Sequence, residues 1–416
     1  MSDQKRSYVG PRGWLAPTRS RLAFGLAVPA VLALALAGCG SDGSSEANGG
    51  GSGPILVGAT QGITGVGAAS CGPIAKAQEA WLDHVNSEGG VNGRTFEYKL
   101  KDDGFDPTRS VSNARALLTR DHVMTLLGGC SSGTTAALVP FAEQNKIPYI
   151  APYGSVPELF SPPKDYSFGL FPAYESQFGA LIDWAYKDLG PGSVMGVTFS
   201  TNEDLYQKDV IDKVEGAGQQ YLGGITFKIG QSSFSSEVLQ LKEKNPDYIV
   251  FAGAATDATN LVKEMARQDW RPGKMILSMG TMADDVYASS AGDAAEGISV
   301  AGSPFILTDD PAAAPCADAL GIPQSDLTSF NLFGCASADI LVEAVRQLGD
   351  DVSSESLAAL MRSGFSADIP FIAGGKAQSA PDHILNPNLL PVTVMGGKLA
   401  LSSAGAPLIP VPAEGS

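Results

Sequence analysis

The segment VMTLLGGCSSGTTAALVPFAEQNKIPYIAP, residues 123–152, decides the fold. It begins with an apolar run, Val123 to Leu127, and ends with a second, Ile147 to Ala151; such runs are typical of strands buried on both faces. Between them, a loop rich in glycine and hydroxyl residues leads into a helix predicted over Ala136 to Gln144. Two buried strands joined through a helix form a parallel crossover unit. The segment therefore predicts an α/β protein.

The same alternation extends in both directions from this unit. Upstream, the predicted elements are a strand at Ile55–Ala59, a helix at Pro73–Glu88, a strand carrying Phe96, Tyr98 and Leu100, and a helix from the Asp106-Pro107 cap to about Arg120. After Pro172 they are helices at Gln177–Leu189, Asp204–Gly216, Ser235–Lys244, Thr256–Gln268 and Ser337–Gln347, and strands at Val194–Phe199, Gly224–Ile229, Tyr248–Ala252, Lys274–Met279, Ile298–Ala301, Leu390–Met395 and Lys398–Leu401. Units repeating every ~25 residues predict two doubly wound parallel sheets, one in each of two lobes.

Residues 1–38 have the pattern of an export signal. Arg19 and Arg21 precede the apolar run Leu22 to Ala37, which at about sixteen residues is short for a membrane span. The run ends in Leu36-Ala37-Gly38-Cys39, which resembles the lipobox of bacterial lipoproteins, in which the cysteine is lipidated. We expect residues 39–53 to form a flexible tether. We expect a lipid anchor at Cys39 on the extracytoplasmic face of the cell membrane; an ordinary cleavage site beside an unrelated cysteine is the alternative.

Four further cysteines remain for disulfide bonds: Cys71, Cys130, Cys316 and Cys335. Four thiols of an exported chain allow three pairings. We favour Cys71 with Cys130, which would join two loops at strand ends of one sheet, and Cys316 with Cys335, which would close a short loop. The alternative, reactive thiols, has no His or Lys cluster nearby in the sequence to support it.

Charge and composition exclude several classes of function. The chain has 28 Lys and Arg against 44 Asp and Glu, a formal net charge of −16. Such acidity repels phosphate backbones, so a nucleic-acid partner is not expected. The three histidines and five cysteines include no CxxC or HExxH spacing, which argues against a structural zinc or haem site. We therefore expect neither a metal nor a cofactor.

Two loops that follow predicted strands carry small polar residues suited to a ligand. After Leu127 come Ser131 and Ser132, whose hydroxyls, with the N–H groups of the next helix, suit a carboxylate. After Ala151 come Tyr153 and Ser155, at the same edge of the sheet. The alternative is that these small residues only form tight turns.

Two catalytic patterns compete with a binding site, and both are incomplete. Residues 129–133 fit G-x-S-x-G, in which Ser131 would be a hydrolase nucleophile and His383, the only downstream histidine, its base. However, His383 lies in a proline-containing loop, and no HGGG-type oxyanion loop follows an early strand. The pattern from Gly65 to Ser70 approaches G-x-G-x-x-G but ends in serine. We expect that the protein is not an enzyme.

Beyond these loops, a set of short motifs resembles a known family. The motifs are Gly89-Gly90-Val91-Asn92-Gly93-Arg94, Asp102-Asp103, Asp106-Pro107, Ser131-Ser132, Ile147-Pro148, Ile150-Ala151-Pro152, Pro157-Glu158-Leu159, Asn245-Pro246-Asp247 and Ala291-Gly292-Asp293-Ala294-Ala295-Glu296-Gly297. Together they span nearly all of residues 54–402 and resemble the type 1 periplasmic binding proteins, in particular the leucine/isoleucine/valine-binding branch. The resemblance implies an ABC-importer receptor whose two lobes close over a small ligand and then dock on permease subunits.

The resemblance also implies lobe boundaries and a hinge of several chain crossings. The first lobe is expected to comprise residues 54–171 and 302–386, and the second 172–301 and 387–402, followed by a tail at 403–416. The crossings are placed near Leu170–Pro172, Ala301–Ser303 and Asn386–Asn388.

Site residues follow from the same resemblance, position by position. Ser131 and Ser132 would meet the ligand's carboxylate, while the Tyr153 main-chain carbonyl and Ser155 match residues that hold its amino and carboxyl groups. In the second lobe, Tyr206 loosely matches an aromatic contact. Met282 lies in Met279-Gly280-Thr281-Met282, the stretch in which amino-acid binders place a Glu.

Two departures from the family's pattern concern the ligand. No Glu follows Met279-Gly280, and Ala254 and Ala255 stand where the amino-acid binders have aromatic rings. Asp284 or Asp285 is the available substitute for the missing Glu. The expected ligand is a small amino acid or a related carboxylate or amide. Because a buried ammonium without a carboxylate is costly, the two departures favour, within this class, a ligand without a free amine and bulkier than leucine, such as an aromatic or branched carboxylate or an amide. A ligand-sensing receptor of the same fold is the alternative to a transport receptor.

Overall fold

The computed structural model describes residues 53–199, 203–228, 230–402 and 408–413, and only the backbone at residues 66, 203–209 and 281. The expected signal peptide, Cys39 and nearly all of the tether lie outside the described residues. Within the described part, none of the helices has both the length and the apolar character needed to span a bilayer.

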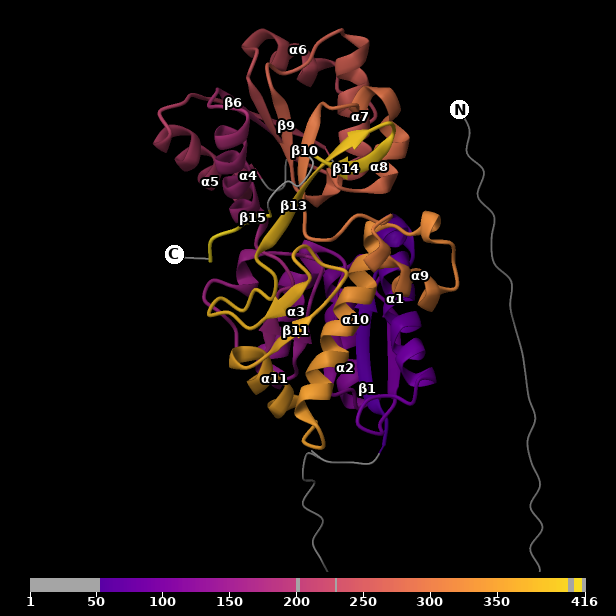
Figure 1. Ribbon diagram of the computed structural model, residues 1–416. Coiled ribbons are helices and arrows are strands. Elements are labelled where there is room, and N and C mark those ends of the chain that lie inside the picture. The colour runs from indigo at the N-terminus through magenta and orange to yellow at the C-terminus, as the bar shows by residue number, and fades with distance from the viewer. Residues whose placement is uncertain (1–52, 200–202, 229, 403–407, 414–416) are drawn as a thin grey trace, which may run out of the picture. The chain divides into compact units, whose positions relative to one another are not determined.

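The first sheet has five parallel strands in the order β2-β1-β3-β4-β5. The label β1 marks this sheet in Figure 1. Its strands are β1 (Ile55–Gln61), β2 (Phe96–Asp102), β3 (Thr125–Leu127), β4 (Tyr149–Ile150) and β5 (Ser167–Phe168). Its helices are α1 (Ala68–Ser87), α2 (Pro107–Thr119), α3 (Ser132–Asn145), α9 (Ala314–Leu320), α10 (Ser329–Leu348) and α11 (Ser354–Ser363). A small hairpin, β11 (Ser366–Asp368) with β12 (Lys376–Gln378), accompanies them.

Helices cover both faces of this sheet because alternate strand residues point to opposite sides. Ile55 and Val57 of β1 are buried in the core formed with α1 and α10, whereas Leu56 packs against the core formed with α2 and α3. As predicted, Asp106 caps α2: its side chain accepts hydrogen bonds from the N–H groups of Thr108 and Arg109, at 2.8 and 3.0 Å.

The second sheet has the order β14-β13-β10-β9-β8-β6-β7, and β15 pairs with β13. Its strands are β6 (Val194–Phe199), β7 (Tyr221–Phe227), β8 (Tyr248–Ala252), β9 (Met275–Ser278), β10 (Ser299–Ser303), β13 (Asn388–Met395), β14 (Lys398–Leu401) and β15 (Ile409–Pro410). All pair in parallel except β13, β14 and β15. Its helices are α4 (Tyr174–Asp188), α5 (Glu203–Gly216), α6 (Ser235–Lys244), α7 (Ala255–Arg267) and α8 (Asp285–Ala291). The prediction of two doubly wound sheets is confirmed.

The chain passes between the two sheets three times, and the three passages are bonded to one another. They follow β5, follow β10 and precede β13. The Asn386 N–H donates to the Leu170 carbonyl at 2.8 Å, which joins the third crossing to the first. The buried Asn386 side chain donates to the Pro304 carbonyl at 3.4 Å, which joins the third to the second. These are the segments in which the sequence analysis places the hinge.

Both predicted disulfide bonds are present. Cys71 on α1 is bonded to Cys130 in the loop after β3, and Cys316 on α9 is bonded to Cys335 on α10. All four cysteines are buried. The first bond therefore fixes the loop that carries Ser131 against the first helix of the sheet.

Several element boundaries differ from the prediction. Helix α1 begins at Ala68 rather than at Pro73, so Pro73 lies inside the helix. The additional first turn includes Cys71, whose side chain is buried. Helix α10 begins at Ser329 rather than Ser337, since Thr328 and Asn331 form reciprocal capping bonds. Strand β7 covers Tyr221–Phe227 instead of 224–229, and the short helices α8, α9 and α11 were not predicted.

Candidate ligand-binding site

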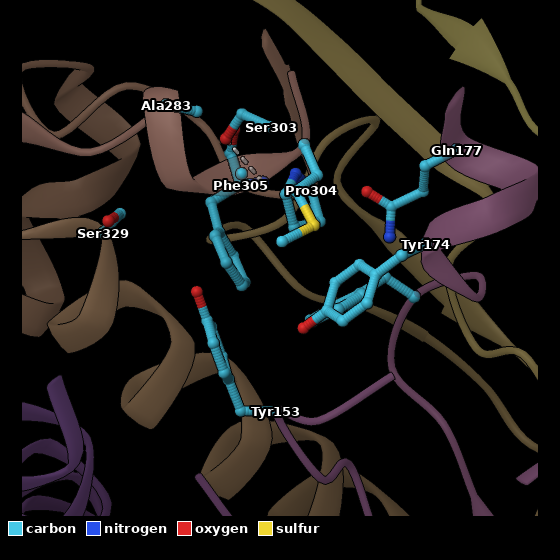
Figure 2. A pocket seen from close by; sticks show the side chains of 11 residues that line it. Tyr153, Tyr174, Gln177, Ala283, Ser303, Pro304, Phe305 and Ser329 are labelled. Carbon is cyan, nitrogen blue, oxygen red and sulfur yellow. Dashed lines mark hydrogen bonds between the residues drawn. The ribbon is translucent and has the colours of Figure 1, made fainter. Parts of the chain in front are cut away.

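A cavity lies where the crossings meet the carboxyl ends of β4, β9 and β10 (Figure 2). The loop after β4 contributes Tyr153, and the first crossing with α4 contributes Phe171, Tyr174 and Gln177. The remaining lining residues are Met279, Gly280 and Ala283 after β9, Ser303, Pro304 and Phe305 at the second crossing, and Ser329 at the start of α10. Elements of both sheets therefore contribute to one site, at the strand ends where ligands of open α/β sheets bind.

Aromatic rings form much of the wall and hold one another in place. The Tyr153 ring meets Phe171 and Phe333 edge to face, with centroids 5.9 and 5.1 Å apart. Phe171 in turn meets Phe305 edge to face at 6.2 Å. Such contacts favour fixed ring orientations, so the cavity presents a preformed apolar surface to a ligand.

The polar groups on the wall are uncharged. The hydroxyl groups of Tyr153 and Tyr174 and the amide of Gln177 are directed toward the cavity (Figure 2). The Gln177 Nε2 donates to the Pro172 carbonyl at 2.7 Å. Burial raises the pKa of Tyr153 well above its ordinary value and that of Tyr174 to about 12, so both phenols are neutral at physiological pH. None of the described residues that line the cavity is an Asp, Glu, Lys or Arg.

Two carboxylates, those of the buried Asp284 and the partly exposed Asp285, lie at the start of α8. Asp284 caps the helix by accepting from the Val286 N–H at 2.7 Å and also accepts from the Ser329 hydroxyl at 3.2 Å. Burial raises the pKa of Asp284, and burial together with the Asp284 charge raises that of Asp285 to about 6. Ser329 thus stands between the Asp284 carboxylate and the cavity, and whether either Asp takes the place of the missing Glu stays a prediction.

The predicted serine contacts lie beside the cavity and do not line it. Ser131 is the N-cap of α3 and accepts from the Thr134 N–H at 3.0 Å. The Ser155 hydroxyl lies 2.8 and 2.7 Å from the carbonyl oxygens of Phe171 and Pro172, to which it donates. Ser155 therefore stabilises the first crossing in this conformation.

The other predicted contacts are dispersed. Tyr153 lines the cavity, whereas Met282 is buried in the core of the second sheet. Tyr206 belongs to α5, and its side chain lies outside the described residues, as does Cys39. Sequence reasoning missed Phe171, Tyr174, Gln177, Phe305 and Ser329. The available signal was an aromatic residue beside a proline, Phe171-Pro172 and Pro304-Phe305, at each of two predicted crossings.

The described geometry does not support a hydrolase site at Ser131. The Ser131 hydroxyl is 2.9 Å from that of Thr134, while His383 Nδ1 is 2.6 Å from the Lys164 carbonyl and its ring packs against Phe168. Each group has a different partner, whereas nucleophilic catalysis requires the serine and the base to share a hydrogen bond.

Comparisons with known proteins agree with this architecture. Residues 54–398 match the sequence model of a family described as periplasmic binding protein. The chain is 24% identical over 316 residues to Leu/Ile/Val-binding protein homolog 1 of Brucella abortus, which covers 74% of this chain and 83% of the relative.

Solved structures share the fold at lower sequence identity. One is a branched chain amino acid ABC transporter protein from Thermus thermophilus with bound valine, with a TM-score of 0.75, 19% identity, and coverage of 84% of this chain and 96% of that one. Another is the fatty acid ABC transporter substrate-binding protein of Thermomonospora curvata, with a TM-score of 0.72, 21% identity, and coverage of 86% and 95%.

Proposed function

Because the chain belongs to the periplasmic binding protein family, we propose that it is the lipid-anchored, extracytoplasmic solute receptor of an ABC importer. In this proposal, Cys39 carries the lipid, and residues 39–53 tether a two-lobed binding domain to the membrane. The domain closes by bending at the three crossings and presents the closed form to permease subunits. The relatives named for branched-chain amino-acid transport support this class of function.

The observation that carries the proposal is the composite cavity. Its wall takes residues from the first sheet's loops, from α4 and from the second crossing. A ligand that contacts both sheets binds the closed arrangement better than the open one, so it shifts the population toward closure. The bonds of Asn386 to Leu170 and Pro304 keep the three crossings together while they bend.

The residues that line the cavity also restrict the chemical class of the ligand. Phe171, Phe305 and Met279 suit an apolar or aromatic body, and the uncharged hydroxyl and amide groups suit one polar head. An ammonium would meet no carboxylate on the wall and would lose solvation without compensation. We therefore propose an aromatic or branched carboxylate, or the corresponding amide. The Thermomonospora curvata neighbour, which is named for fatty acids, is consistent with ligands that lack an amine.

Isothermal titration calorimetry of the purified protein tests this proposal. The panel is leucine, 4-methylpentanoate, 4-methylpentanamide and 3-phenylpropanamide. We expect at least one compound without an ammonium to bind, and the bound protein to gain about 2.7 kcal/mol of stability at a ligand concentration of 100 Kd. Tight binding of leucine alone would refute the ligand class.

A matched pair of variants tests the site. Phe305→Ala removes a ring from the cavity wall and should weaken binding tenfold or more, whereas Leu239→Ala, on an exposed position of α6 that is 59% accessible, should leave affinity unchanged. Equal affinities of the two variants would place the ligand elsewhere.

Cell fractionation and uptake test the anchor and the transport role. Cys39→Ser should move the protein from the membrane fraction to the medium or periplasm. Deletion of the gene should abolish uptake of the radiolabelled ligand. Normal uptake in the deletion strain would instead favour the alternative of a sensing receptor.

A further inference from the structure

Gln177 places a buried amide in the wall of the cavity. It lies close to the start of α4, shortly after the first crossing, and is only 1% exposed. Its side chain is directed toward the cavity (Figure 2). A buried polar group without a hydrogen-bonding partner is costly, so the partners of both ends of this amide matter for what the cavity binds.

The nitrogen of the amide already has a partner within the protein. Nε2 of Gln177 donates to the Pro172 carbonyl at 2.7 Å, and the Ser155 hydroxyl donates to the same carbonyl, also at 2.7 Å. Because a carbonyl oxygen only accepts, this contact determines which end of the amide is the NH2 group. The other end, Oε1, accepts no hydrogen bond from a described residue. Gln177 therefore presents an acceptor to the cavity in a fixed orientation.

Two serine hydroxyls of the wall likewise use their protons within the protein. The Ser329 hydroxyl donates to the Asp284 carboxylate at 3.2 Å, and the Ser303 hydroxyl donates to the Phe305 carbonyl at 2.9 Å. A hydroxyl group has one proton and keeps acceptor capacity after it has donated. Toward a ligand, these two side chains are therefore acceptors as well.

We propose that Gln177 is a specificity-determining residue whose side-chain oxygen accepts a hydrogen bond from an N–H of the ligand, so that this protein prefers an uncharged primary amide to a carboxylate. The inference rests on the proposed function and divides the two ligand classes named there. A carboxylate has no proton to offer Oε1, and it loses its hydration when it enters the cavity.

An amide head complements the groups on the wall. Its NH2 donates to Oε1 of Gln177, and its carbonyl oxygen accepts from a phenol such as Tyr153. A site built to hydrogen-bond one group of its ligand rejects an analogue that lacks the group, because the polar atom of the site is then left unpaired. The methyl ketone of the same shape is such an analogue, since it keeps the carbonyl and carries CH3 in place of NH2.

Calorimetry at pH 7.5 with three compounds of one carbon skeleton tests the inference. They are 4-methylpentanamide, the ketone 5-methylhexan-2-one and the carboxylate 4-methylpentanoate. The wild type should bind the amide at least tenfold more tightly than either of the others. The amide 3-phenylpropanamide and the ketone 4-phenylbutan-2-one form a second pair with an aromatic body, for which we expect the same preference.

A matched pair of variants assigns the preference to Gln177. Gln177→Met removes the amide oxygen and keeps the length of the side chain, while the Pro172 carbonyl retains Ser155 as a donor. Its affinity for the amide should fall at least tenfold, and it should bind the ketone at least as tightly as the amide. Gln240→Met makes the same exchange at an exposed position of α6 and should keep the preference of the wild type.

Two results would overturn the inference. One is a wild type that binds neither amide at least tenfold more tightly than its ketone, or that binds 4-methylpentanoate as tightly as 4-methylpentanamide; this comparison needs no variant. The other is a Gln177→Met protein, folded by circular dichroism, that keeps a tenfold preference for the amide over the ketone. Failure of the proposed function has a different signature, since then neither these compounds nor leucine would bind the wild type.

Discussion

Replacement of Asp339 by Asn should make the protein more stable, and increasingly so as the pH rises. Asp339 lies on α10, is only 8% exposed, and accepts a hydrogen bond from the Trp81 Nε1 of α1 at 3.2 Å. Burial, and secondarily the charge of Glu343, raises the pKa of Asp339 from 3.8 to about 7. The Asn side chain keeps an oxygen acceptor for Trp81 and carries no charge, so it retains the contact and removes the cost of ionisation.

The direction in which the stability changes with pH follows from proton linkage. Between pH 3.8 and about 7, the folded protein holds a proton on Asp339 that the unfolded chain has released. The free energy of unfolding therefore falls as the pH rises through this window, and the loss is complete above pH 7. A pKa difference of about 3 corresponds to about 4 kcal/mol in full, of which about 2.6 kcal/mol develops between pH 5 and pH 8.

Urea unfolding of the wild type and Asp339→Asn at pH 5 and pH 8 measures this difference. The stability of the variant relative to the wild type should increase by about 2 to 3 kcal/mol from the lower to the higher pH. Asp285, whose pKa burial also raises, to about 6, is common to both proteins and cancels in the comparison. Asp318→Asn, at an exposed position of α9, is the control and should show no such gain. A difference that does not vary with pH would refute the reasoning.

Three further substitutions follow from the packing. Gly334→Ala should lower the free energy of unfolding by about 1 to 3 kcal/mol. The added Cβ would lie 2.5 Å from the Ile74 carbonyl oxygen and would force α10 away from α1. An unchanged urea midpoint would contradict this prediction. Replacing both Cys71 and Cys130 by Ala should lower the free energy of unfolding by about 4 kcal/mol, since the disulfide bond closes a loop with a sequence separation of 59. Equal stability of the oxidised wild type and the variant would contradict this prediction. Ser155→Ala removes the hydroxyl donor of the Phe171 carbonyl, while the Pro172 carbonyl keeps Gln177 as a donor, and should cost about 1 to 3 kcal/mol in thermal unfolding. A loss of ligand affinity at unchanged stability would instead make Ser155 a direct ligand contact.

The elements and their order could be predicted because they depend on local chemistry. The apolar run at Tyr248–Ala252 and the cap at Asp106 each specify an element through neighbouring residues alone, and both match the structure. The start of α10 was missed because its signal, the reciprocal bonds of Thr328 and Asn331, uses an Asn where the usual pattern has Glu or Gln. The antiparallel pairing of β13 with β10 depends on the path of the third crossing and has no local signal.

The features of the candidate site can likewise be separated into those with a local sequence signal and those without one. The sequence by itself determined the two α/β sheets and the small-residue loop at Ser131 and Ser132, because each has a pattern of neighbouring residues. It favoured one of three possible disulfide pairings, which the structure then confirmed. Only the tertiary structure decided that Tyr153, Tyr174 and Phe305 line one cavity. These side chains are separated by up to 152 positions in the sequence. They meet because the topology of the crossings brings their backbones together. The path of the crossings cannot be predicted from patterns of neighbouring residues.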